Sequence, residues 1–216
     1  MKELNVVSIR EKEYKDIPVY NCRIEQGLED YFNKHAWEDA KIENQVSNTH
    51  YLIEDEKIVG YFTLSLNTYK IQKNKQKKLN LKSVEKRHGI NQNKEKHEGV
   101  YIVVYLNFFG IDDNFKGKKI DSENLDAKYS DLLFFLLFTK LQSIFETLPF
   151  SMIVLQAFEK VSWFYEKYDF EFIQKSHDGM KIYVFPSNRI DNYLDMENED
   201  SPFYNLLNYL DKKQIN

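Results

Sequence analysis

The side chains that most often act as nucleophiles, bases or metal ligands are few and scattered along this chain. Cys22 is the single cysteine, so an internal disulfide and a zinc site built from cysteines are both excluded. His35 and Glu38 fall within a predicted helix and His50 precedes a predicted strand, and they match neither a catalytic triad nor the spacing of metal ligands. We expect Cys22 to be a small buried hydrophobic residue. The residues therefore predict no metal site, and no general base is evident.

Positive charge is concentrated in residues 70–97, which hold ten Lys and Arg against two Glu, a balance of +8. The formal net charge of the whole chain is −4, which leaves −12 for the remaining residues. We expect this basic stretch to be an exposed excursion between two strands. It is either a solvated loop or an electropositive surface for a phosphate-bearing partner such as RNA or a nucleotide cofactor. Few aromatic residues interrupt the run, so base stacking is not supported.

The composition is that of a water-soluble globular protein. A length of 216 residues favours one domain, or at most two small ones. The 16 Phe, 15 Tyr and 2 Trp supply a large core and exclude disorder of the whole chain. The longest apolar run, Leu132 to Phe138, is too short to span a membrane, and residues 1–15 do not form a secretory signal. We expect a cytoplasmic protein with no membrane contact.

The apolar patterns alternate between strand and helix. The predicted helices are 25–42, 130–145 and 159–168, and the predicted strands are 6–9, 51–53, 58–66, 100–111, 152–155, 170–174 and 181–185. The run Glu54-Asp55-Glu56-Lys57, with three acidic residues, indicates a hairpin turn. Strand 100–111, helix 130–145 and strand 152–155 form a βαβ unit, whose two strands should be parallel. This order predicts an α/β (α+β) domain around a mixed sheet in residues 1–190, followed by an acidic extension, 191–216, with a short helix.

Four local motifs within this order resemble the GNAT acyltransferase superfamily, from about Tyr20 to Phe185. They are the hairpin Tyr51–Leu66, the strand and loop Phe109–Ile120, the helix Val161–Phe170, and the entry Tyr20-Asn21-Cys22 followed by Leu28, Tyr31 and Phe32. The helix resembles the family's Phe-Tyr-x-x-x-Gly-Phe motif, with Asp169 where glycine is usual. The entry is similar to that of bacterial toxin-like acetyltransferases. The resemblance implies a mixed, mostly antiparallel central sheet with a parallel, splayed strand pair and flanking helices.

The resemblance also implies a site for acetyl-CoA as co-substrate. The backbone of Phe109, Gly110 and Ile111 would bind the pantetheine arm, unless these residues form an ordinary core strand. Lys116, Gly117, Lys118 and Lys119 stand where the family binds the pyrophosphate.

This loop departs from the family's Arg/Gln-x-x-Gly-x-Gly/Ala pattern. Lys119 and Asp121 replace both later glycines, and the following helix is expected only at Ser130. Asp121, Glu123 and Asp126 would repel a phosphate that they faced. Either the lysines supply charge in place of the missing helix amides, or the site has been remodelled or lost.

Tyr165 matches the tyrosine that protonates the departing thiolate in many relatives. Its ordinary pKa near 10 suits a general acid. The alternative is a core aromatic residue of a helix. Because the amine can be deprotonated through water in this family, the lack of an evident base does not exclude the activity.

The resemblance therefore predicts an acyl-CoA-dependent N-acetyltransferase that moves an acetyl group from acetyl-CoA to a primary amine, without a metal. One alternative is a non-catalytic binding module with a decayed CoA loop. Another is a toxin-like acetyltransferase acting on aminoacyl-tRNA, with a tRNA contact through residues 70–97. A homodimer is left open, and a neutralising antitoxin cannot be inferred from one chain.

Overall fold

The structure is a computed structural model that describes residues 4–41, 43–44, 46–72, 75–76, 79, 98–120 and 125–214. Its contacts divide the chain into two compact units, which we describe separately. Unit 1 comprises residues 1–65, 107–141 and 192–216, and unit 2 comprises residues 66–106 and 142–191. Two strands and one long helix contribute residues to both units.

A seven-stranded sheet has the order β1-β2-β3-β4-β5-β7-β6. The strands are β1 Leu4–Ser8, β2 Asn48–Glu54, β3 Lys57–Gln72, β4 Glu98–Ile111, β5 Met152–Ala157, β6 Glu171–Lys175 and β7 Lys181–Pro186. The pairs β1–β2, β2–β3, β5–β7 and β6–β7 are antiparallel, and β4–β5 is parallel. The predicted mixed, mostly antiparallel sheet with one parallel pair is therefore confirmed.

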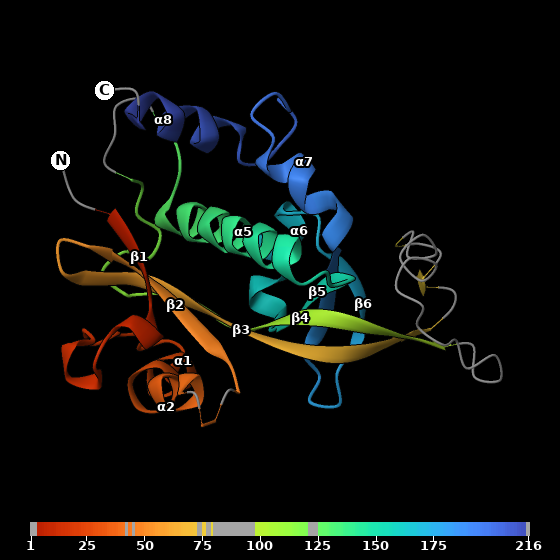
Figure 1. The fold of residues 1–216 in the computed structure, drawn as a ribbon, viewed down its shortest axis with the longest axis horizontal. Coiled ribbons are helices and arrows are strands. Elements are labelled where there is room, and N and C mark those ends of the chain that lie inside the picture. The colour runs from red at the N-terminus through yellow and green to blue at the C-terminus, as the bar shows by residue number, and fades with distance from the viewer. Residues whose placement is uncertain are drawn as a thin grey trace. The chain divides into compact units, whose positions relative to one another are not determined.

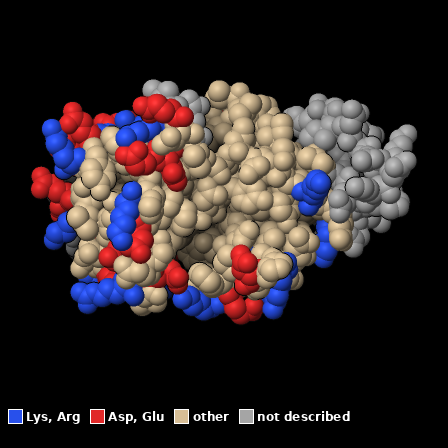
Figure 2. Space-filling view, turned by 90° about the horizontal axis from the view of Figure 1, so that it is seen from below, with Lys and Arg blue, Asp and Glu red and all other residues tan. Residues whose placement is uncertain are grey.

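In unit 1, helices cover both faces of the β1–β2–β3 ribbon (Figure 1). One face carries a continuous helical stretch made of α1 (Gln26–Asp30), the π-helix η3 (Tyr31–His35) and α2 (Ala36–Ala40). The other carries the beginning of α5 (Tyr129–Thr147) and α8 (Tyr204–Gln214). Lys, Arg, Asp and Glu side chains are interspersed over the α1–α2 side (Figure 2), so that surface has no single sign of charge.

The π-helix Tyr31–His35 affects which side chains of the first helical stretch face the sheet. A cluster of apolar residues from this stretch and the strands beneath it is buried, including Phe32, Ala36, Tyr51 and Tyr61. The sequence periodicity predicts one regular helix over residues 25–42. The structure has a helical stretch in this place, but its middle part is a π-helix and not an α-helix. Such turns shift the residues around them relative to a regular α-helix and are frequent at functional sites.

The β2–β3 hairpin turns where the acidic run predicts, but through two residues instead of four, because Glu54 and Lys57 are paired in the strands. Asp55 and Glu56 both have positive φ angles, 48° and 65°. This pair of left-handed residues is typical of a type I′ turn, whose twist matches that of the flanking strands. The turn thus has the geometry usually made with Asn-Gly, but it is built from two acidic residues.

In unit 2, one face of the strands carries an apolar cluster that includes Val103, Met152, Val154 and Val184. Val103 lies opposite Met152 in the parallel β4–β5 pair, which confirms the predicted βαβ unit. On β7, Tyr183 alternates with Val184 and points to the opposite face. There it meets α6 (Ser162–Lys167), which follows the short helix η4 (Glu159–Val161).

Most of the basic stretch lies outside the described residues. β3 continues to Gln72, past the predicted end at Leu66, and β4 begins at Glu98, so residues 73–97 connect two neighbouring strands. The described part packs on unit 2: the Gln76 amide donates to the Ile71 carbonyl at 2.7 Å, and Leu79 is buried in the same cluster as Ile71. This part is therefore not a fully solvated loop.

The C-terminal residues of unit 1 pack on α5. The Tyr193 and Phe203 rings each lie 5.4 Å from the Phe138 ring. A 3-10 turn η5 (Ser187–Arg189) and α7 (Ile190–Leu194), which the pattern does not predict, lead toward this segment. The division into residues 1–190 and 191–216 stays a prediction. Within the described residues, no helix combines the length and apolar character needed to cross a membrane.

Candidate functional site

The end of β4 presents successive side chains to opposite faces of unit 1, as a strand must. The Phe108 ring stacks on Tyr31 of the π-helix, with ring centres 3.8 Å apart and planes at 17°. The Phe109 ring instead meets Phe134 of α5 edge-on at 5.4 Å. This part of β4, where the sequence predicts contacts to an acyl carrier, is therefore held between the two helical layers.

Gly110 is required by its neighbours. A Cβ atom at this position would lie 2.4 Å from the Tyr20 hydroxyl, and one at Gly60 would lie 2.4 Å from the Gly110 carbonyl oxygen. The space that a Cβ of residue 110 would occupy is filled by the Tyr20 side chain. The absence of a side chain at Gly110 is therefore explained by Tyr20, without a ligand on that side. The Tyr20 side chain is fully buried, and no described atom makes a hydrogen bond to its hydroxyl.

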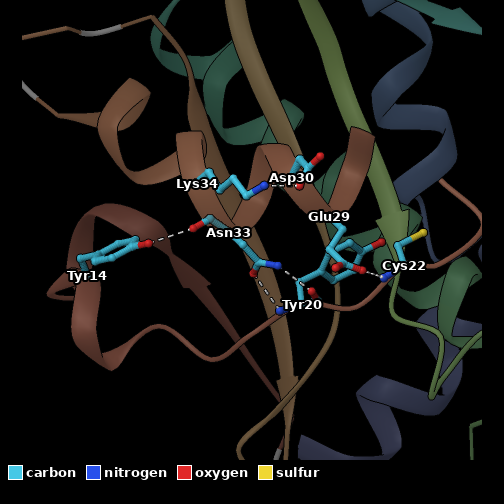
Figure 3. Close-up of polar contacts among 7 residues, drawn as sticks. All are labelled: Tyr14, Tyr20, Cys22, Glu29, Asp30, Asn33 and Lys34. Atoms are coloured by element: carbon cyan, nitrogen blue, oxygen red, sulfur yellow. Dashed lines mark hydrogen bonds and ion pairs between the residues drawn. The ribbon is translucent and has the colours of Figure 1, made fainter. Parts of the chain in front are cut away.

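The segment that carries Tyr20 is tied to the first helical stretch (Figure 3). The Tyr20 amide donates to Asn33 Oδ1 at 3.0 Å, and Asn33 Nδ2 donates back to the Tyr20 carbonyl at 2.8 Å. Two residues on, the Cys22 amide donates to Glu29 Oε2 at 2.7 Å. These side-chain contacts replace a regular backbone ladder, so the segment is ordered although it belongs to no helix or strand.

A buried carboxylate then joins this segment to the end of β4. Asp112 is 2% exposed, and it accepts hydrogen bonds from the Asn21 amide at 2.8 Å and from the backbone and side chain of Asn114 at 2.8 and 2.9 Å. Its own amide donates to the Val59 carbonyl at 2.9 Å. The sequence reasoning missed Asp112. An aspartate directly after a buried strand, two residues before Asn, is the signal that could have found it.

The loop after Asp112 is compact and leaves two backbone donors free. Gly117 has a φ of +72°, a conformation that glycine adopts without strain. The Lys118 amide donates to the Phe115 carbonyl at 3.0 Å, and the Ile120 amide to the Ala127 carbonyl at 2.9 Å. Among the described residues, no acceptor is found for the amides of Gly117 and Lys119. Two donors two residues apart can bind a bridging anion.

The three lysines of this loop are not equivalent. All are exposed, but Lys119 Nζ lies 2.6 Å from Asp126 Oδ1 in an exposed ion pair. Lys116 and Lys118 form no ion pair with any residue in the described ranges. Asp126 therefore lowers the positive charge of the loop by occupying one lysine, which is a milder effect than the direct repulsion of a phosphate expected from the sequence.

The helix after the loop is delayed, as predicted. α5 begins at Tyr129, one residue before the expected start, and Asp131 Oδ2 accepts a hydrogen bond from the Lys128 amide at 3.0 Å. The Tyr129 amide donates a hydrogen bond to the backbone carbonyl of Lys118 at 3.2 Å, which joins the loop to the start of α5. The expectations for Asp121 and Glu123 lie outside the described residues.

Tyr165 belongs to unit 2 and is buried, with 8% of its surface exposed. Its ring packs against Phe164 at 5.5 Å and Phe170 at 6.0 Å, and burial raises its pKa above the ordinary value. Asp169, which takes the place of the usual glycine, has a φ of 53°, so the family's glycine preference here reflects a left-handed helix end. The structure describes Tyr165 and the residues 109–119 in separate units.

The remaining candidates from the sequence do not form a site. His35 and Glu38 are exposed on the first helical stretch, and Cys22 is buried as expected. His50 is buried, and its pKa is lowered to about 4 by burial and by the positive charges of Lys140 and Arg10. Within the described ranges, no three His, Cys, Asp or Glu side chains are grouped to hold a metal ion.

No protein-family model and no curated protein sequence matches this chain. Among solved structures, a bacterial toxin matches 90% of the chain and 96% of its own length, with a TM-score of 0.65 and 14% identity. The toxin AtaT in complex with acetyl-methionyl-tRNAfMet matches 88% of the chain and 98% of its own, with a TM-score of 0.61 and 16% identity. A point mutant of AtaT bound to acetyl-CoA and the C-terminus of the antitoxin AtaR matches 88% and 96%, with a TM-score of 0.58 and 14% identity.

The chain has the GNAT fold of these toxins. The resemblance found in the four sequence motifs is thereby confirmed at the level of the fold. At such low sequence identity, a shared fold does not determine the ligand or the reaction, which depend on the residues of the site.

Proposed function

We propose that this chain is an acyl-CoA-dependent N-acetyltransferase that moves an acetyl group from acetyl-CoA to a primary amine. The observation that carries the proposal is the loop after β4, whose Gly117 and Lys119 amides are free and whose Lys116 and Lys118 are unpaired within the described residues. By the resemblance of Phe109–Ile120 to the GNAT motif, this loop corresponds to the one that would bind the pyrophosphate. The AtaT structure with acetyl-CoA supports the choice of donor.

The described residues fit a pyrophosphate in charge and donor type. Lys116, Gly117, Lys118 and Lys119 would hold it through two amides and two free ammonium groups, which replace the helix-terminal amides lost with the motif glycines. Lys119 would contribute chiefly through its amide, because its side chain is paired with Asp126. The backbone of Phe109, Gly110 and Ile111 would position the pantetheine arm.

When bound, acetyl-CoA supplies the thioester carbon that the amine attacks and the thiolate that leaves. Tyr165 is the proposed general acid. The phenol is protonated at neutral pH even at its ordinary pKa near 10, and burial raises the pKa of Tyr165 further, so the group holds a proton that a developing thiolate could accept. Positioning both reactants on one fold removes most of the entropic cost of their encounter.

For the acceptor we propose the amine of an aminoacyl-tRNA, with a toxin-like role. The support is the AtaT complex with acetyl-methionyl-tRNAfMet and the similarity of the Tyr20-Asn21-Cys22 entry to such toxins. Residues 70–97, with their balance of +8, are the proposed tRNA contact. A protein antitoxin partner is proposed by the same analogy with AtaT and AtaR, and a homodimer stays a prediction.

Calorimetry with acetyl-CoA tests donor binding. Lys116→Glu combined with Lys118→Glu should weaken acetyl-CoA binding at least tenfold, about 1.4 kcal/mol, because it reverses both free cations of the loop. Lys12→Glu, on an exposed lysine of unit 1, is a charge-reversal control that should leave binding unchanged. Absence of binding by the wild-type chain at millimolar acetyl-CoA would favour the non-catalytic binding module.

A further inference from the structure

The segment that ends at Arg23 runs beside the first residues of the loop after β4. The Asn21 amide donates to Asp112 at 2.8 Å, and the Asp113 amide donates to the Asn21 carbonyl at 3.0 Å. The Arg23 amide then donates to Asp113 Oδ2 at 2.9 Å. These three hydrogen bonds fix the backbone of Arg23 next to residues that come only a few positions before Lys116.

The side chains of Arg23, Lys116 and Lys118 form no ion pairs among the residues that the structure describes. All three side chains are exposed. The two nearby carboxylates are already engaged by N–H donors: Asp112 holds Asn21 and Asn114, and Asp113 holds the Arg23 amide. Unpaired cations beside free backbone amides form a binding site for an anion.

We propose that Arg23 is a phosphate-binding residue of the donor site, supplied by the Tyr20–Arg23 segment. The proposal rests on the proposed function and identifies what compensates for the lost glycines of the pyrophosphate loop. A guanidinium group binds two phosphate oxygens at once, whereas each lysine acts as a point charge. The contacts of Asp112 and Asp113 fix the backbone of Arg23 beside the first residues of the loop. The phosphate is either the pyrophosphate or the 3′-phosphate of CoA.

The test compares Arg23→Gln with Arg10→Gln, which removes an exposed arginine of the 3-10 turn η1 (Ile9–Glu11) in the same unit. Calorimetry would use acetyl-CoA, acetyl-3′-dephospho-CoA and S-acetyl-pantetheine, with melting curves as a check on folding. We expect Arg23→Gln alone to weaken acetyl-CoA binding at least tenfold and to leave S-acetyl-pantetheine binding unchanged. A loss that persists with the dephospho compound identifies the pyrophosphate, and a loss that disappears identifies the 3′-phosphate.

Equal acetyl-CoA affinity in wild type, Arg23→Gln and Arg10→Gln would overturn the assignment of Arg23 and leave the proposed function standing. If the wild-type chain binds no acetyl-CoA, the proposed function fails, and inorganic pyrophosphate becomes the probe for the anion site. Pyrophosphate binding that is lost in Arg23→Gln but kept in Arg10→Gln would still support the site. No such difference would overturn it.

Discussion

Single residues explain how the loop after β4 departs from the GNAT pattern while keeping features that suit a phosphate. Gly117, at a position that the GNAT pattern leaves variable, has the left-handed conformation that favours glycine. Lys119 replaces the first motif glycine. Its amide has no acceptor among the described residues, and its side chain pairs with Asp126. The loop therefore keeps backbone donors even though its sequence no longer matches the motif.

Tyr165→Phe is expected to lower kcat roughly a hundredfold, because general acid catalysis contributes on the order of 10²–10⁴. The substitution removes only the hydroxyl and keeps the ring that packs against Phe164 and Phe170. Stopped-flow or steady-state release of free CoA measures kcat. Tyr168→Phe, on a fully buried tyrosine at the end of the same helix, serves as the control and should keep kcat. A Tyr165→Phe protein with full kcat would contradict the role of general acid and would indicate that Tyr165 is only a core residue.

His50 should make the protein less stable as the pH falls from 6.5 to 4. Its folded pKa of about 4 lies below the ordinary 6.5, so the unfolded chain binds the proton more tightly in this window. The loss amounts to roughly 3 kcal/mol of unfolding free energy for a shift of this size. Urea denaturation at several pH values should show a shallower decline for His50→Gln than for wild type.

The exposed His177 provides the matched control, since its side chain is fully accessible. His177→Gln should follow the wild-type pH dependence. Identical curves for wild type and His50→Gln would contradict the proposed cost of burying an imidazole between Lys140 and Arg10.

Properties that depend on the residue type alone could be inferred from the sequence, but roles that depend on tertiary contacts could not. Cys22 was expected to be buried, and it is. Asp112 was missed, because its partner Asn21 lies 91 residues away. Tyr20 was named in the entry motif, but its close approach to Gly110 was not predicted. The pairing of Lys119 with Asp126 likewise depends on how the loop closes, which charge patterns alone do not determine.

At the scale of secondary structure, apolar periodicity was sufficient for most helices and strands. The parallel β4–β5 pair follows from the connection through α5, since a strand–helix–strand unit of this length returns in the same direction. The π-helix Tyr31–His35 could not be predicted, because its side-chain spacing differs little from that of an α-helix. The extension of β3 to Gln72 was also missed, because Lys70 begins the basic stretch that suggested a loop.

The β2–β3 hairpin predicts a stabilising substitution. Glu56 has a φ of 65° in the two-residue turn, and a left-handed conformation costs an ordinary residue about 1–2 kcal/mol. Glu56→Gly removes this strain and adds entropy to the unfolded chain, so we expect a net gain of about 0.5–1 kcal/mol in unfolding free energy. Urea denaturation measures it. Lys57→Gly, one residue later within β3, should destabilise, and a loss in Glu56→Gly would argue against the turn.

At the scale of the whole molecule, the proposed activity needs residues from both compact units. The donor loop and Arg23 belong to unit 1, and Tyr165 belongs to unit 2. β3, β4 and α5 contribute residues to both units. The basic stretch of residues 70–97 falls between two of these strands and adds the proposed tRNA contact to the same molecule.

Transfer of radiolabelled acetyl groups from acetyl-CoA to bulk tRNA charged with mixed amino acids tests the central claim most directly. We expect label in the aminoacyl-tRNA fraction, blocked by prior chemical acetylation of the amino acids, absent with uncharged tRNA, and strongly reduced in Tyr165→Phe. A steep fall in rate with added salt should accompany it, because the basic stretch releases counterions from the tRNA. No labelled aminoacyl-tRNA or small-amine product, from a folded chain that binds acetyl-CoA, would contradict the assignment as an N-acetyltransferase.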